Sequence, residues 1–158
     1  MNATYSIWKP VDVHSGDVVR AARRKIGKKC KVGHAGTLDP FAEGILVLCF
    51  GENTKTVPDI MAMQKEYRAR IRFGVETDTL DKTGEFFKTS KIPSLNKDKI
   101  LEVLSSFVGS IKQSPPAFSA LKLNGRCLYE YARRGIRVRK KVRKVEIYSI
   151  KLLDYDSD

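Results

Sequence analysis

Hydrophobic and polar residues follow the spacing of strands in four parts of the chain. The runs TYSIW at 4–8 and GILVLCFG at 44–51 are short and apolar, and the second is typical of a buried strand. KEYRARIRFG at 65–74 alternates strictly, which predicts a half-buried strand with Tyr67 on its apolar face and arginines on the other. The closing segment 142–158 alternates imperfectly and predicts one more strand.

Two other segments have the spacing of amphipathic helices. Ser15 is expected to cap a helix that runs from about Gly16 to Ile26, and Gly27 is expected to end it. Asn96 can cap a second helix, which we expect to end at Gly109 or slightly beyond. The apolar stripe of this second helix consists of Ile100, Leu101, Leu104, Phe107, Val108 and Ile111. Strands and helices together predict the α+β class.

The segment QSPPAFSALKLNGRCLYEYARRGI, residues 113–136, follows neither pattern. Its Pro-Pro pair at 115–116 excludes regular structure there, and Asn124-Gly125 marks a tight turn. A short helix is expected between this turn and Gly135. Because the segment is irregular and rich in aromatic and basic residues, we expect it to leave the core and grip a partner.

Composition restricts the class of protein. The chain has 158 residues, 42% of them hydrophobic, which suits one soluble folding domain. No apolar run is long enough to cross a bilayer, and MNATYSIWKP lacks a signal-peptide pattern, so we expect a cytoplasmic protein without a membrane partner. The three cysteines form no CxxC pair and there are two histidines, so neither a disulfide framework nor a metal site is expected.

Positive charge is concentrated in two runs. Arg20–Lys31 holds seven basic residues and Arg133–Lys144 holds eight, and neither run contains an acidic residue. Since the net charge of the whole chain is +12, the other residues carry −3. Segregated charge of this kind favours a nucleic acid, because each neutralised phosphate releases counterions. Two solvated faces of a soluble protein are the alternative.

One acidic residue follows the first basic run, in the sequence HAGTLDP at 34–40. Pro40 disfavours the α region for Asp39, which is therefore expected in an extended turn. Gly33 and Gly36 would let the backbone approach closely and adopt positive φ. From its spacing alone, Asp39 could also cap a turn or pair with a lysine.

Three separated motifs resemble the bacterial tRNA pseudouridine synthase B family, TruB. They are GHAGTLDPFAEGILVLCFGENTK, KEYRARIRFGVETDTLDKTGE and QSPPAFSALKLNGRCLYEYARRGI, and the similarity extends from about Trp8 to the end of the chain. The resemblance implies the pseudouridine synthase fold, a mixed, mainly antiparallel sheet flanked by helices and incomplete at the C-terminus. It also implies one partial catalytic domain over 1–158, in which about 113–142 corresponds to the RNA-gripping thumb.

The resemblance implies roles for individual side chains. Asp39 corresponds to the catalytic aspartate, Tyr67 to the tyrosine that stacks on the target uracil, and His34 to the side chain that enters the RNA loop. Asp81 corresponds to an aspartate that helps order the site. Without the resemblance, His34 would be a hydrogen-bonded loop residue and Tyr67 a core aromatic. The residues expected to contact RNA are Lys122, Arg126, Arg133, Arg134, Arg23 and Arg24.

The implied function is the isomerisation of the uridine at position 55, in the T-loop of tRNA, to pseudouridine. The target base must leave its stack to be reached. No cofactor is expected, because the substrate is neither oxidised, reduced nor hydrolysed overall. The expected partner is tRNA, through its T-loop and stem, and a monomer is expected. A tRNA-binding or tRNA-folding module without catalysis, and a guide-RNA-dependent synthase of the archaeal and eukaryotic type, are the alternatives.

The sequence departs from the family pattern in identifiable places. Lys9 and Pro10 match the N-terminal KP motif, but the family usually has glycine at the position of Asp12 and threonine at that of His14. Family members also continue past the equivalent of Asp158 into a GTYIR-like segment, whose arginine pairs with the catalytic aspartate, and usually into a small C-terminal RNA-binding extension. We therefore expect the chain as given to bind tRNA weakly and to isomerise uridine poorly or not at all.

Overall fold

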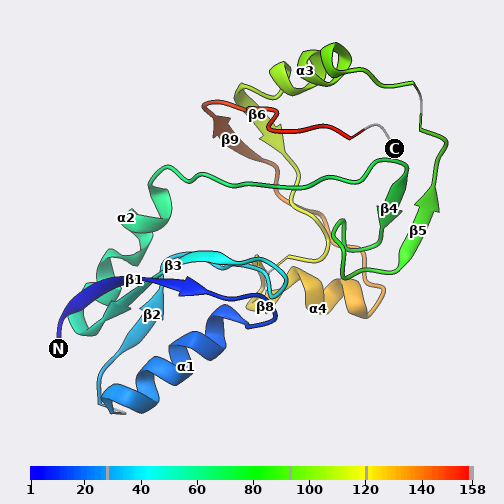
Figure 1. Cartoon of the computed structure of the whole chain (residues 1–158). Coiled ribbons are helices and arrows are strands. Elements are labelled where there is room, and N and C mark those ends of the chain that lie inside the picture. The colour runs from blue at the N-terminus through cyan, green and yellow to red at the C-terminus, as the bar shows by residue number, and fades with distance from the viewer. Residues whose placement is uncertain (28, 93, 120, 157–158) are drawn as a thin grey trace. The chain divides into compact units, whose positions relative to one another are not determined.

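The computed structural model of the chain describes residues 1–27, 29–92, 94–119 and 121–156. The chain divides into two compact units, Met1–Ala69 and Arg70–Asp158 (Figure 1). Every strand pairing among the described residues is antiparallel. Helices and antiparallel strands confirm the α+β class, whereas the single catalytic domain over 1–158 stays a prediction.

The first unit contains a three-stranded sheet in the order β1-β3-β2. Its strands are β1 (Ala3–Lys9), β3 (Gly44–Phe50) and β2 (Val32–His34). The strands predicted from TYSIW and GILVLCFG are thereby confirmed. Helix α1 (Ser15–Ile26) ends at Gly27 as predicted, and a short 3-10 helix η1 (Gly51–Thr56) and α2 (Val57–Ala62) follow the sheet (Figure 1).

The core of the first unit lies between α1 and the sheet. Its buried residues are Val32, Leu46, Leu48 and Phe50. Three of them alternate along β3, because every second residue of a strand faces the same side. Val18, Val19 and Ala22, which lie on one face of α1, pack against this cluster. Burying one large apolar side chain contributes roughly 1.5–3 kcal/mol, so the cluster fixes α1 against the sheet.

The second unit contains short antiparallel pairs and two helices in its described residues. The pairs are β4 (Val75–Thr77) with β5 (Phe86–Thr89), β6 (Gly109–Gln113) with β9 (Arg143–Ile147), and β7 (Lys122–Leu123) with β8 (Arg126–Cys127). The helices are α3 (Lys97–Ser105) and α4 (Leu128–Arg133). Strand β9 lies inside the predicted closing strand and confirms it in part.

The turn signals read from the second unit are confirmed. The Asn96 side chain accepts a hydrogen bond from the Lys99 N–H at 2.8 Å and so caps α3. Asn124 and Gly125 have φ of 50° and 81°, which is the left-handed pair that a two-residue hairpin requires between β7 and β8. Gly135 follows α4 with φ of 67°, where the sequence predicted the helix to stop.

The predicted end of α3 is wrong. The helix ends at Ser105 rather than at Gly109, and Ile111, expected in the helical stripe, lies in β6 opposite Val145. Gly109 has φ of 101°, which no right-handed helix contains. Pairing with the distant strand β9 therefore overrides a continuous apolar pattern.

The predicted strand at 65–74 is also wrong. No residue from 64 to 73 is buried, Tyr67 is 73% exposed, and the segment forms no strand. A half-buried strand needs a partner strand and a layer on its apolar face, and none of the described residues pairs with this segment. The interpretation of Tyr67 as a core aromatic is wrong for the same reason.

Within the ranges that the structure describes, no helix is both long enough and apolar enough to cross a membrane.

Candidate functional site

Asp39 is exposed on the segment 35–43 that joins β2 to β3, which we call the Asp39 loop. Gly36 has φ of 110°, as predicted, so the chain turns away from β2 there without steric cost. The Ala42 N–H donates to the Asp39 carbonyl at 3.0 Å, which closes a turn after the aspartate. Gly33 lies in β2 and does not have positive φ, so that part of the prediction is wrong.

The ammonium group of Lys9 holds the loop on the C-terminal side of Asp39. Lys9 is 0% exposed, and its Nζ donates to the carbonyl oxygens of Val13 (2.7 Å), Pro10 (2.8 Å) and Pro40 (3.3 Å). The Asp12 N–H also donates to the Pro40 carbonyl, at 2.7 Å. A buried cation is costly unless it is hydrogen-bonded, and here three carbonyl groups compensate it. The end of β1 and the Asp39 loop are thus tied together at one point.

The hydroxyl of Ser15 holds the loop on the N-terminal side of Asp39. Ser15 is 3% exposed, and its Oγ donates to the Leu38 carbonyl at 2.9 Å and accepts from the Leu38 N–H at 3.1 Å. The prediction that Ser15 caps α1 is therefore wrong, since the N-cap is His14, whose side chain makes no capping hydrogen bond. A serine at a helix start has the sequence signature of a local cap. Its bond to a distant loop is visible only in the folded chain.

The carboxylate of Asp39 makes no hydrogen bond or ion pair with any described residue. The alternative in which it pairs with a neighbouring lysine is therefore not what the structure shows. The backbone is held at Leu38 before it and at Pro40 after it, while the side chain itself is exposed. The loop presents an unpaired carboxylate on a fixed support.

His34 is the last residue of β2 and lies at the start of the same turn. Its Nδ1 is 2.5 Å from the Gly36 carbonyl oxygen. Because a carbonyl oxygen only accepts hydrogen bonds, Nδ1 carries the proton, and in the neutral ring Nε2 is then the acceptor. The structure therefore brings His34 and Asp39 onto one short connection between two strands.

Tyr67 belongs to the first unit as well, in the exposed segment that follows α2. No hydrogen bond or ring contact joins it to the Asp39 loop among the described residues. Its aromatic face is therefore free to contact another molecule. Its role in stacking on a base stays a prediction.

Asp81 lies in the second unit, in the turn between β4 and β5. Its Oδ1 accepts hydrogen bonds from the Thr83 N–H (2.8 Å), the Thr83 hydroxyl (2.5 Å) and the Thr79 hydroxyl (2.8 Å). Partial burial by itself raises the pKa of the Asp81 carboxyl, but these hydrogen bonds together outweigh it and lower the pKa below its ordinary value. Asp81 thus orders its own turn, and its contribution to a catalytic site stays a prediction.

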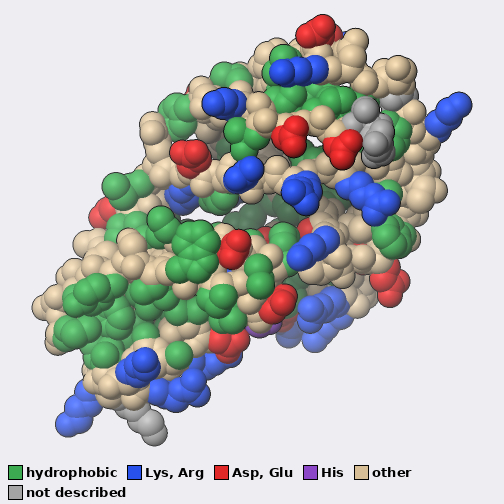
Figure 2. Space-filling model, viewed as in Figure 1, with side chains coloured by type: hydrophobic (Ala, Val, Ile, Leu, Met, Phe, Trp, Pro, Cys, Tyr) green, Lys and Arg blue, Asp and Glu red, His purple; other side chains and the backbone are tan. Residues whose placement is uncertain are grey.

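The basic residues singled out on α1 are exposed. Arg20 forms an ion pair with Asp17 one turn earlier, whereas Arg24 has no ion-pair partner among the described residues. Arg23 donates from Nη2 to the Val32 carbonyl at 3.4 Å. Figure 2 shows Lys and Arg side chains along the lower edge of the first unit, beside a broad hydrophobic area. The unpaired positive charge on this helix therefore lies at Arg24 and Lys25 and in part at Arg23.

The basic residues singled out in the second unit lie on the hairpin and on α4. Lys122 is in β7 and Arg126 in β8, and both are exposed. Arg133 ends α4, with its guanidinium carbon 5.4 Å from the centre of the Tyr129 ring, and Arg134 follows it. A guanidinium over a ring is a favourable arrangement that leaves its charge at the surface.

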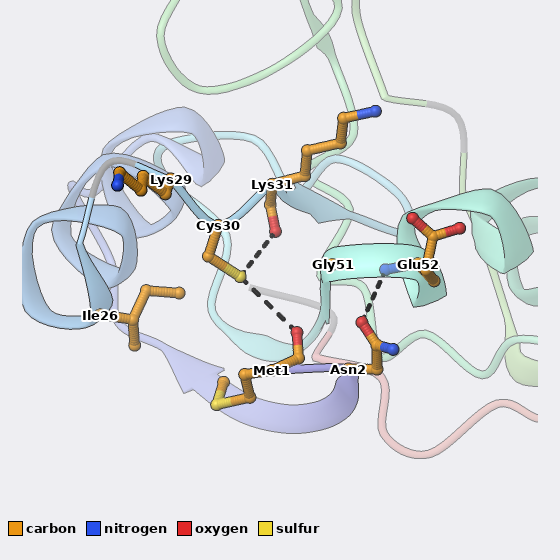
Figure 3. A pocket seen from close by; sticks show the side chains of 8 residues that line it. All are labelled: Met1, Asn2, Ile26, Lys29, Cys30, Lys31, Gly51 and Glu52. Atoms are coloured by element: carbon orange, nitrogen blue, oxygen red, sulfur yellow. Dashed lines mark hydrogen bonds between the residues drawn. The ribbon is translucent and has the colours of Figure 1, made fainter.

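A pocket of about 600 Å³ opens elsewhere in the first unit, near the N-terminus (Figure 3). Its thiol, Cys30, donates to the Lys31 carbonyl at 3.4 Å and to the Met1 carbonyl at 3.7 Å. Lys31 points its ammonium group away from this thiol. The pocket contains no residue of the Asp39 loop, and the described residues include no cluster of three or more His, Cys, Asp or Glu that could hold a metal ion.

A sequence profile identifies the family. The profile of the TruB family pseudouridylate synthase, N-terminal domain, matches residues 23–158. The chain belongs to the TruB family. The resemblance found in the three motifs is thereby confirmed, including its restriction to the N-terminal portion.

Curated relatives of the TruB chain are similar over nearly all of its length. The tRNA pseudouridine synthase B of Clostridium perfringens strain 13 is 46% identical over 158 residues, which are 100% of this chain and 53% of the relative. That of Clostridium tetani is 43% identical over 153 residues, covering 97% of this chain and 53% of the relative. That of Dechloromonas aromatica is 46% identical over 150 residues, covering 95% and 50%. The chain spans about half the length of the curated relatives it matches.

A solved structure confirms the fold of this TruB chain. A chain in the crystal structure of a Cbf5-Nop10-Gar1 complex matches with a TM-score of 0.56 and 21% identity, over 97% of this chain and 36% of that one. At this identity the likeness supports the pseudouridine synthase fold and no finer property.

Proposed function

We propose that this TruB chain supplies the catalytic aspartate of a tRNA pseudouridine synthase, which isomerises the uridine at position 55 of the T-loop. The curated relatives are named tRNA pseudouridine synthase B, and two of them match 100% and 97% of the chain. One observation of the structure carries the proposal. The Asp39 carboxylate is exposed and unpaired among the described residues, while the backbone on both sides of it is held by buried side chains.

The proposed reaction needs one well-placed carboxylate. The bond between uracil N1 and ribose C1′ breaks, the base turns, a new bond joins C5 to C1′, and the proton on C5 is exchanged for one on N1. Asp39 can act as a nucleophile toward the sugar or the base, or as a base that removes a sugar proton. No net oxidation, reduction or hydrolysis occurs, so the chemistry requires no cofactor.

His34 and Tyr67 are the proposed substrate contacts around Asp39. Extruding a base costs about a few kcal/mol. The exposed ring of Tyr67 can stack on the extruded uracil and offset part of this cost. His34, at the start of the turn that carries Asp39, can fill the space that the base leaves in the loop. The proposed role of Asp81 is to order the loop on which it lies.

The proposed partner is tRNA, whose phosphate backbone would be bound by the two basic runs. Arg23 and Arg24 on α1 and the cations of the thumb segment 113–142 would contact phosphates, which set the register without reading bases. The exposed positions of Lys122 and Arg126 on a two-residue hairpin support this role. The concentration of charge also supports a second candidate function, a tRNA-binding module without catalysis.

One experiment separates the two candidates. An unmodified tRNA transcript is incubated with excess protein in a single-turnover format, and pseudouridine is mapped along the whole transcript. The proposed enzyme places pseudouridine in the T-loop, and Asp39→Asn abolishes it while tRNA binding stays within about twofold. Glu43→Gln, a charge change at the end of the same loop, is the matched control and retains modification.

The second candidate gives a different result. A binding module binds the transcript with a marked salt dependence but leaves no pseudouridine, with or without Asp39→Asn. T-loop modification that survives Asp39→Asn would contradict the assignment of the aspartate. Absence of both binding and modification would contradict both candidate functions for this chain.

A further inference from the structure

We propose that Ser15 is a positioning residue for the Asp39 carboxylate. The inference rests on the proposed function, because it concerns how the catalytic side chain is held in place. Its starting point is the double contact between the Ser15 hydroxyl and Leu38, the residue directly before Asp39. This buried hydroxyl donates its one O–H and accepts one hydrogen bond, both with that one residue.

The two hydrogen bonds fix two successive peptide groups. The Leu38 N–H belongs to the peptide group that joins residues 37 and 38, and the Leu38 carbonyl to the one that joins residues 38 and 39. Each peptide group is planar, so the conformation of Leu38 is set once both groups are held against Ser15. The second peptide group extends to the Asp39 Cα, so holding it fixes the point at which the Asp39 side chain leaves the backbone.

The other side of Asp39 is restrained independently. Proline at position 40 limits the backbone of Asp39, and the Pro40 carbonyl accepts hydrogen bonds from Lys9 and Asp12. Asp39 therefore lies between two anchored residues, while its own carboxylate has no hydrogen-bond or ion-pair partner among the described residues. Within the described part of the chain, the position of this carboxylate is therefore restrained through the backbone on its two sides.

Ser15 connects the anchor to the core. It is the first residue of α1, and α1 is fixed by the packing of Val18 and Ala22 on the sheet. Among small side chains, only a hydroxyl can both donate and accept a hydrogen bond at one atom. Alanine at position 15 would therefore leave the N–H and the carbonyl of Leu38 without this partner. A displacement of about 1 Å at a reacting group can cost roughly 100-fold in rate, so loss of this contact should reduce catalysis more than binding.

The first test does not depend on activity. In NMR spectra of the chain, Ser15→Ala is expected to raise the exchange rate of the Leu38 amide at least tenfold and to broaden the distribution of Asp39 side-chain rotamers. The amides of Val19 and Ala22 in α1 are expected to keep their protection. Ser15→Thr, which retains the hydroxyl, is expected to restore both the Leu38 protection and the Asp39 rotamer, and Ser6→Ala, at an exposed serine of β1, is the matched control.

The second test separates positioning from binding. In single-turnover isomerisation of a tRNA transcript, Ser15→Ala is expected to lower the rate about 10-fold to 100-fold with Kd for the transcript unchanged within about twofold. Ser15→Thr is expected to recover at least a third of the rate. A purely structural role would instead lower rate and affinity together and would expose the amides of α1.

The outcomes distinguish this inference from the proposed function. If the wild-type chain isomerises no uridine even at single turnover, catalysis by this chain alone is excluded, and the Leu38 amide and the Asp39 rotamers still decide the role of Ser15. An Asp39 rotamer distribution that is the same in wild type and Ser15→Ala overturns the inference. A loss of α1 protection in Ser15→Ala that Ser15→Thr does not repair overturns it as well.

Discussion

Asp12 has a backbone conformation that few residues adopt. Its φ is 60°, in the left-handed region, where the family usually has glycine. Aspartate is one of the few other residues found there, so the turn is kept and the Asp12 N–H still donates to the Pro40 carbonyl. The departure from the family pattern therefore leaves the support of the Asp39 loop intact, although at some cost in strain.

Replacing Asp12 with glycine is expected to stabilise the first unit. Glycine adopts this conformation freely and keeps the N–H, so Asp12→Gly should raise the free energy of unfolding by up to about 1 kcal/mol. This is the net effect of relieving the backbone strain and of the greater conformational entropy that glycine gives the unfolded chain. Urea unfolding followed by the fluorescence of the single tryptophan, Trp8, measures the first unit. Asp12→Ala is the control and should lower the free energy of unfolding. A destabilising Asp12→Gly would show that the aspartate side chain contributes a contact that outweighs the strain.

The lowered pKa of Asp81 predicts a dependence of stability on pH. A carboxyl group whose pKa is lower in the folded state stabilises the fold above its ordinary pKa of 3.8, and this contribution is lost as the pH falls through the folded pKa. Thr83→Val removes the hydroxyl that donates to Asp81, so the pKa of Asp81 should rise. Carboxyl carbon shifts in an NMR pH titration measure it directly.

A control and a stability measurement complete this test. Thr89→Val in β5 lies outside the hydrogen bonds of Asp81 and should leave its pKa unchanged. Acid unfolding of the second unit should become less steep in Thr83→Val, because less stability then depends on the ionised carboxylate. An unchanged pKa of Asp81 in Thr83→Val would mean that the hydrogen bonds from the Thr83 N–H and the Thr79 hydroxyl are enough to lower it.

At the scale of an element, helix α1 lacks a side-chain cap. His14 is its N-cap residue and makes no capping hydrogen bond, whereas the serine that has the sequence signature of a cap is engaged with Leu38. Threonine, which the family usually has at the His14 position, can accept a hydrogen bond from the first turn. The serine of this chain thus contacts the Asp39 loop, and helix α1 has no side-chain cap.

His14→Thr is expected to supply the missing cap. The free energy of unfolding of the first unit should increase by about 1 kcal/mol, as for other side-chain caps. His14→Ala is the control, because it removes the imidazole without adding a cap, and it should leave the stability within about 0.5 kcal/mol. Denaturation followed at Trp8 again reports on the first unit. Equal stabilities of His14→Thr and His14→Ala would show that the N–H groups in the first turn of α1 gain nothing from a side-chain cap.

Element boundaries were predictable where a local residue determines them. Gly27, Asn96 and the Asn124-Gly125 turn were read correctly, because positive φ and side-chain capping depend on residues next to each other in sequence. The end of α3 and the segment 65–74 were not, since both depend on which strand pairs with which. An alternation of apolar and polar residues predicts which side chains would share a face of a strand. It does not indicate whether another strand is available to pair with it.

At the scale of the molecule, the relevant property is where charge is left unpaired. The positive charge of the chain is concentrated in two runs. Ion pairs within the chain lower the amount of this charge that is available to contact a phosphate backbone. On α1, Arg20 is paired with Asp17 and Arg24 has no such partner among the described residues. The two arginines lie four residues apart on one helix, which makes them a matched pair for an experiment.

Arg24→Gln is expected to weaken tRNA binding more than Arg20→Gln. A cation that contacts a phosphate contributes roughly 0.7–0.9 to the slope of log K against log salt, so Arg24→Gln should reduce the slope by about that amount. Arg20→Gln should leave the slope nearly unchanged, because Asp17 already neutralises Arg20. Fluorescence anisotropy of a labelled tRNA at several salt concentrations measures both. Slopes equal to that of the wild type in both variants would exclude phosphate contacts by these two arginines, and an equal reduction in both would show that the ion pair with Asp17 does not keep Arg20 from the RNA.

The sequence by itself determined the family, the α+β class, the two basic runs and the residues of the HAGTLDP motif. These properties depend on residue identity and on neighbours along the chain. Only the tertiary structure showed that buried Lys9 and Ser15 hold the backbone on both sides of Asp39, and that Tyr67 is exposed rather than packed in a strand. The physical reason is that a buried hydrogen bond or a strand pair needs a partner brought close by folding, and no local pattern states which partner that is.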